Sequence, residues 1–107
     1  MARASTTSDP FNAIAEPRRR HILEFLAGDE RSVSDIVDAL EMGQPSVSKH
    51  LNVLRNVDLV TVRRDGRRIL YRANAQTLKT IHDWSGMFAQ HWRGQLRRIK
   101  AHAEEKR

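Results

Sequence analysis

Four arginines surround an Asp-Gly pair near the middle of the chain, in residues 63–68, which read Arg-Arg-Asp-Gly-Arg-Arg. Asp-Gly between β-branched and apolar stretches predicts a two-residue hairpin turn, so we expect Arg64 to face Arg67 and Arg63 to face Arg68. Like charges directly opposite each other weaken a hairpin, and a bound polyanion would relieve that repulsion. The cluster therefore indicates a cationic ribbon that binds a polyanion. A charged edge that resists aggregation is the alternative.

A second candidate surface lies on a helix that begins at Pro45 and runs to about residue 56. On a helical wheel, Val47, Leu51 and Leu54 fall on one face, which we expect to be the core side. The opposite face is polar, small and singly basic, which suits hydrogen bonding to base edges and phosphates. An ordinary solvated face is the alternative, and His50 is interpreted as a packing or capping histidine. The outward-facing residues are Pro45, Lys49, Asn52 and Asn56, and Ser46 and Ser48 flank them near the N-terminal end of the helix.

A shorter helix precedes this one. Ser32-Val33-Ser34-Asp35 fits a variant capping box, and an apolar run follows it. Glu41-Met42-Gly43 then makes a tight connection to the helix at Pro45. Two short helices joined by a turn that contains Gly are the sequence pattern of a helix-turn-helix. In that motif the second helix enters the major groove of DNA and its N-terminal residues touch base edges.

The remaining segments predict a mainly helical chain with one small hairpin. Earlier helices begin at Pro10 and Pro17, because Pro is accepted at the first helical position. The hairpin strands cover residues 59–64 and 67–72, and a single amphipathic helix runs from about residue 75 to 103. The expected order is α-α-α-α-β-β-α, with a disordered tail over residues 1–8, a winged helix-turn-helix domain over 9–103 and a charged tail over 104–107.

The charge is distributed unevenly along the chain. The 107 residues include 19 Lys and Arg against 13 Asp and Glu, a net charge of +6. Residues 9–42 carry four basic and eight acidic side chains, net −4, whereas residues 43–72 carry seven basic and two acidic, net +5. A basic block beside an acidic block favours a polyanion-binding face on an otherwise soluble domain.

The composition excludes several other classes of protein. No cysteine is present, which excludes disulfides, zinc fingers and thiol sensing. No apolar run approaches the roughly 20 residues of a membrane span, and no secretory signal is visible, so we expect a cytoplasmic protein with no membrane partner. No catalytic constellation appears, which argues against an enzyme. His91, His102 and Glu105 are too few for a strong metal site, so we expect no metal and no cofactor.

An apolar stripe lies near the C-terminus. Trp84, Phe88 and Trp92 recur at four-residue intervals, and Phe11 and Ile14 form a shorter stripe near the N-terminus. Because a chain this short buries a limited fraction of its surface, we expect these residues to form the interface of a homodimer. A small-ligand pocket between the helices and packing within one chain are the alternatives.

These motifs together resemble the ArsR (arsenic-repressor) family of bacterial winged helix-turn-helix transcription regulators. The resemblance rests on residues 15–23, 44–54, 59–60 and 66–71, which read AEPRRRHIL, QPSVSKHLNVL, LV and GRRILY. It implies a homodimer joined through its first and last helices, which binds an inverted-repeat operator in double-stranded DNA, usually as a repressor. Carried over by position, the base-reading residues are Gln44, Pro45, Ser48 and Lys49, with Ser46 alongside.

The chain departs from the metal-sensing members of that family. Ser32 and Ser34 stand near the positions of their cysteines, and the positions of their carboxylate–histidine set hold one possible ligand. The chain therefore resembles the cysteine-free, non-metal branch, and an unidentified small-molecule effector remains open. A winged helix that binds protein or RNA is the alternative function. The residues at the carboxylate–histidine positions are Ala75, Thr77, Phe88 and His91.

Overall fold

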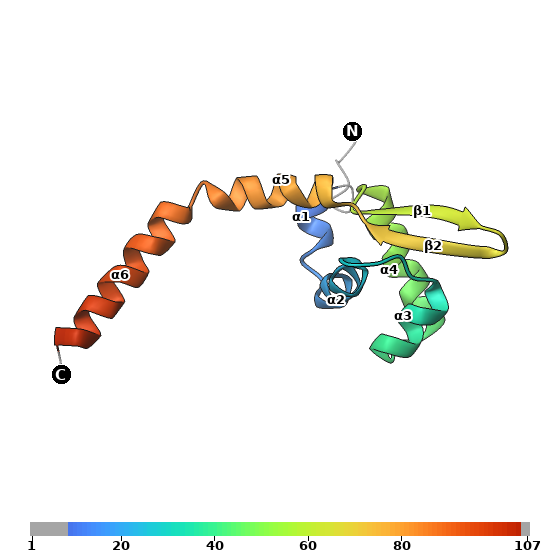
Figure 1. The fold of residues 1–107 in the computed structure, drawn as a ribbon, viewed down its shortest axis with the longest axis horizontal. Coiled ribbons are helices and arrows are strands. Elements are labelled where there is room, and N and C mark those ends of the chain that lie inside the picture. Colours follow the sequence, from blue (N-terminus) through green and yellow to red (C-terminus); the bar gives the residue numbers. More distant parts are fainter. Residues whose placement is uncertain (1–8, 106–107) are drawn as a thin grey trace, which may run out of the picture.

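The computed structural model describes residues 9–105, so the predicted disordered tail over residues 1–8 lies outside the described residues, as do residues 106–107. Within that range the predicted mainly helical fold with one hairpin is confirmed (Figure 1). The elements are α1 Pro10–Ala13, α2 Pro17–Leu26, α3 Val33–Leu40, α4 Gln44–Asn56, β1 Val60–Asp65, β2 Arg68–Ala73, α5 Ala75–Gly86 and α6 Ala89–Glu105. No helix in the described range is both long and apolar enough to cross a membrane.

Short polar side chains fix where the early helices begin. The Asp9 carboxylate accepts a hydrogen bond from the Phe11 N–H at 2.9 Å, and the Glu16 carboxylate accepts one from the Arg18 N–H at 3.1 Å. At α3 the predicted capping box is confirmed. The Ser32 hydroxyl accepts from the Asp35 N–H at 3.2 Å, and the Asp35 carboxylate accepts from the Ser32 N–H at 3.0 Å. Each contact satisfies a backbone donor that the helix itself leaves without a partner.

The core joins α2, α3, α4 and the root of the hairpin. Among the described residues, every buried side chain is apolar. The turn between α3 and α4 is made by Glu41 in a left-handed conformation, φ 54°, followed by Met42 and Gly43. The helix-turn-helix is thus fixed by packing. The largest fully buried side chains of the core are Ile22, Leu26, Ile36, Leu51, Leu54, Leu59, Val47 and Val60.

The hairpin has a different register from the predicted one. Arg64 faces Ile69 and Arg63 faces Leu70, so the predicted opposition of Arg64 to Arg67 and of Arg63 to Arg68 is wrong. The turn is made by Gly66 and Arg67, with Gly66 at φ 64°. A positive φ at the first central residue is the arrangement that favours glycine in a hairpin. In this register Asp65 faces Arg68, so an attractive pair replaces the repulsive one.

The predicted single C-terminal helix is wrong, because the helix breaks after Gly86. Met87 and Phe88 form a turn between α5 and α6, and the Phe88 N–H bonds to the Ser85 carbonyl at 3.0 Å. Glycine is a poor helix former, by about 1 kcal/mol relative to alanine. Leu78 and Ile81 of α5 pack against the core, whereas α6 leads away from the body of the molecule (Figure 1). No described residue of α6 belongs to the core cluster, so packing against the core does not hold α5 and α6 in one continuous helix.

Replacing Ser32 with alanine tests the capping box at α3. Ser32→Ala removes the hydroxyl that accepts from the Asp35 N–H, so we expect the free energy of unfolding to fall by about 0.5–2 kcal/mol. Chemical denaturation would measure it. The control is Ser34→Ala, an exposed serine in the same turn, which is expected to change stability by less than about 0.5 kcal/mol. Equal losses in both variants would contradict the capping role.

Candidate nucleic-acid interface

The outward face of α4 is set by its buried face. Val47, Leu51 and Leu54 are at most 1% exposed, which turns the opposite side of the helix to solvent. Ser46 and Ser48 are half-buried on the two flanks of that side. The predicted contact residues that the structure leaves exposed are Gln44, Pro45, Lys49 and Asn52.

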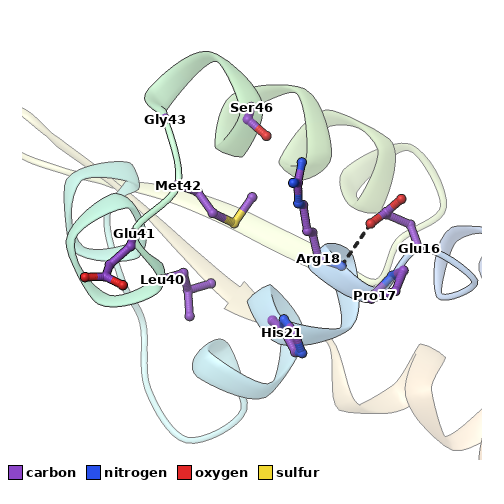
Figure 2. Close-up of a pocket in the computed structure, with 9 residues that line it drawn as sticks. All are labelled: Glu16, Pro17, Arg18, His21, Leu40, Glu41, Met42, Gly43 and Ser46. Atoms are coloured by element: carbon purple, nitrogen blue, oxygen red, sulfur yellow. Dashed lines mark hydrogen bonds between the residues drawn. The ribbon is translucent and has the colours of Figure 1, made fainter.

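One flank of α4 borders an open hollow of about 830 Å³ between α2 and the α3–α4 turn. Figure 2 shows Arg18 reaching from α2 toward α4, with Met42 pointing into the same space and Ser46 on the rim. Ser46 therefore lies between the outward face and this hollow. His50, nearby on α4, is half-buried and its Nδ1 has no hydrogen-bond partner within residues 9–105. Burial and the neighbouring Arg19 lower the pKa of His50.

The β1–β2 hairpin is called the wing below. Of the four arginines in residues 63–68, two form ion pairs and two do not. The Arg63 guanidinium donates two hydrogen bonds to the Glu30 carboxylate, at 2.6 and 2.8 Å, and Arg68 lies 3.6 Å from the Asp35 carboxylate. Arg64 and Arg67 are exposed and form no ion pair with any described residue. The two unpaired cations therefore stand at or next to the tip of the hairpin.

The two acids that pair with the wing titrate below their ordinary range. The hydrogen bond from Arg63 lowers the pKa of Glu30, and the Ser32 N–H and hydroxyl lower the pKa of Asp35, with Arg68 adding to the effect. Carboxylates with lowered pKa values contribute stability that is present at neutral pH and is lost as the pH falls through those values. Sequence reasoning missed Glu30, because 33 residues separate it from Arg63.

Arg55 is another residue that the sequence reasoning missed. It stands near the C-terminal end of α4 and lines a shallow hollow of about 270 Å³ together with Arg64, Ile69 and Tyr71. The available signal was its spacing, because Arg55 follows Asn52 by three residues and Ser48 by seven, on one side of the helix. Arg55 of α4 and Arg64 of the hairpin thus border the same hollow.

The predicted interface residues divide between two places. Phe11 of α1, Trp84 of α5 and Phe88 of the α5–α6 turn form an aromatic cluster, with ring centroids 5.3 Å apart for Phe11–Trp84 and 5.2 Å for Trp84–Phe88. Ile14 is half-buried against the core, and Trp92 lies on α6 with 51% of its surface exposed. The structure thus joins three of the five residues in one exposed apolar patch.

No three His, Cys, Asp or Glu side chains converge on a possible metal site in the part of the chain that the structure describes. His91 and His102 are exposed on α6, and the side chain of Glu105 lies outside the described residues.

A helix-turn-helix whose second helix has an exposed polar face, followed by a hairpin with exposed arginines, is the architecture of a winged-helix DNA-binding protein. Residues 16–62 match the model of the bacterial regulatory protein, arsR family. This chain belongs to the ArsR family, as its sequence motifs predict, and it is a transcription regulator, not an enzyme.

Relatives and solved structures agree with this assignment. The chain is 35% identical over 74 residues to the transcriptional repressor SdpR of Bacillus subtilis (strain 168). The matched region covers 69% of this chain and 82% of SdpR. It is 45% identical over 62 residues to the repressor SmtB of Mycobacterium tuberculosis (strain ATCC 25618 / H37Rv), covering 58% of this chain and 46% of SmtB. The structure of an ArsR-like transcriptional regulator from Rhodococcus sp. RHA1 superposes with a TM-score of 0.70 at 28% identity, covering 90% and 91% of the two chains.

Removing the two unpaired wing arginines should reduce the salt dependence of DNA binding. Each phosphate contact contributes a slope of about −0.9 in log affinity against log salt. Arg64→Ala with Arg67→Ala should therefore flatten the slope by roughly one to two units per half-site and weaken specific and random DNA alike. Fluorescence anisotropy at several salt concentrations would measure both effects.

The control for this pair is Arg93→Ala with Arg97→Ala, which removes the same charge from the exposed face of α6. The control is expected to keep the original slope, and both double variants are expected to keep the melting temperature. A wing variant that melts at a lower temperature and retains the slope would mean that Arg64 and Arg67 are structural.

Proposed function

We propose that this protein is a repressor that binds an inverted-repeat DNA operator as a homodimer, with α4 of each protomer in the major groove and the wing beside it. One observation carries the proposal: the outward face of α4 is polar and carries Lys49, and Arg55 of α4 lines one hollow together with Arg64 of the hairpin. The hairpin turn adds a further exposed cation, Arg67. Relatives such as SdpR and SmtB are named as repressors, which supports the direction of regulation.

Sequence discrimination is assigned to the N-terminal half of α4. Lys49 reaches guanine acceptors or phosphate, whereas the amides of Gln44 and Asn52 suit adenine. Ser48 is short and allows the backbone to approach the bases. Among the described residues of α4, no large apolar side chain is exposed, which disfavours the alternative function of a protein-binding module.

Dimerisation is assigned to α1, α5 and α6. Trp84 and Trp92 are 52% and 51% exposed, and the stripe continues through Leu96 and Ile99, which are 64% and 65% exposed. Contiguous apolar surface of this kind marks an interaction site. A two-fold axis through this surface would present two α4 helices to the two halves of an inverted repeat.

The release of such a repressor from DNA is assigned to a signal other than metal. Ser32 and Ser34 stand near the cysteine positions of the metal-sensing members, and of the four carboxylate–histidine positions only His91 holds a possible ligand. We place the protein in the cytoplasm, where its DNA target is.

Lys49→Ala tests base readout on the site recovered by selection from random DNA. We expect that selection to recover an inverted repeat, and we expect the substitution to weaken that site by about 1–3 kcal/mol and random DNA by less. The control Lys79→Ala removes one lysine from α5, where Lys79 pairs with Asp83 at 2.9 Å, and should leave discrimination unchanged. Equal losses on both DNAs would reduce Lys49 to a phosphate contact.

Light scattering tests the homodimer. At micromolar concentration we expect twice the mass of one chain, and Phe88→Glu with Trp92→Glu should give the mass of one chain, because charges would enter an apolar interface. Gln90→Glu is the matched control, since Gln90 is exposed in α6 outside the stripe. A wild-type chain that stays monomeric and melts cooperatively would refute the dimer.

A further inference from the structure

The wing is fastened to the segment between α2 and α3, and to the first turn of α3, at three points. Arg31 and Tyr71 exchange two backbone hydrogen bonds, at 2.9 and 2.8 Å. The Glu30 carboxylate holds the Arg63 guanidinium, and Asp35 lies near Arg68. The segment itself is held to α2, since the Arg31 guanidinium lies 5.1 Å from the centroid of the Phe25 ring.

Strand alternation separates the arginines of the hairpin. The cross-strand pairs Arg63–Leu70 and Asp65–Arg68 are two positions apart along the hairpin. Side chains two positions apart on a strand point to the same face, so Arg63 and Arg68 share one face of the hairpin. This face is turned toward the α2–α3 segment, where Leu70 is buried. Arg64 lies on the other face, opposite Ile69.

The outer half of the hairpin has little other support. The buried strand residues are Val60 at the root and Leu70, and beyond them Arg64, Ile69 and the turn are all exposed. A two-stranded ribbon is marginally stable by itself, so side contacts must fix its angle to the body. A carboxylate that receives two parallel hydrogen bonds from one guanidinium also constrains orientation, which a point charge does not.

We infer that Glu30 is a positioning residue for the wing: through its paired hydrogen bonds with Arg63 it holds the hairpin at the angle at which Arg64 and Arg67 reach DNA. This inference rests on the proposed function and refines it, since Arg63 then acts through Glu30 and not through a phosphate. An acid beside a DNA-binding wing lowers affinity by repulsion. Pre-organising the wing offsets that repulsion, because the ordering is then complete before binding.

The test compares Glu30→Gln with Glu24→Gln, which removes the same charge from an exposed position on α2. If Glu30 positions the wing, Glu30→Gln weakens operator binding about fivefold, although it removes a negative charge. Random DNA is weakened by a similar factor, because Arg64 and Arg67 contact phosphates in both DNAs. The salt slope stays unchanged, and the melting temperature falls only slightly, because the ion pair is partly exposed. Glu24→Gln leaves operator affinity unchanged or slightly tighter. Operator affinity for Glu30→Gln that equals or exceeds that of wild type would overturn the inference.

Exchanging the two charges gives a second readout. The double variant Glu30→Arg with Arg63→Glu rebuilds the ion pair in reverse and is expected to bind the operator within about twofold of wild type, whereas each single variant is weaker. If the exchange fails to restore binding and Arg63→Ala flattens the salt slope by about one unit, Arg63 contacts phosphate and the inference is wrong. A wild-type protein that selects no DNA sequence overturns the proposed function itself, and this inference with it.

Discussion

The burial of one face of α4 is the constraint on which the rest of the structure depends. Val47, Leu51 and Leu54 fill the space between α2, α3 and the root of β1, and each is at most 1% exposed. A core packed this densely admits one rotation of the helix. The side chains that face outward are therefore determined by the apolar ones that face the interior, and Lys49 is exposed because Val47, Leu51 and Leu54 are buried.

The sequence predicted the elements whose signals are local. The capping box depends on Ser32 and Asp35, three residues apart, and the outward face of α4 depends on a spacing of three and four residues. In both cases the chemistry is complete within one or two turns of helix. The hairpin, the helix-turn-helix and the position of the wing between α4 and the last helices could be predicted for the same reason.

The hairpin register and the contacts between segments distant in the sequence could not be predicted from local signals. The observed and the predicted hairpin registers differ by two residues, which leaves every side chain on the same face, so the alternation of apolar and polar residues fits both. The repulsion between Arg64 and Arg67 was in fact an argument against the predicted register. The pairs Glu30–Arg63 and Asp35–Arg68 connect segments more than 30 residues apart, and the break at Gly86 reflects the lack of packing beyond it.

If the apolar stripe on α6 is buried in the proposed dimer, the stability of each chain depends on the concentration of the protein. In the dimer proposed above, Leu96 and Ile99 are withdrawn from water when two protomers meet and return to it when they separate. Association then contributes to the stability of each chain, and the contribution grows with total concentration. Below the dissociation constant, a protomer exposes the apolar helix by which unpaired subunits aggregate or are degraded. In the proposed dimer, the stability of each chain therefore depends on how much of the protein is present.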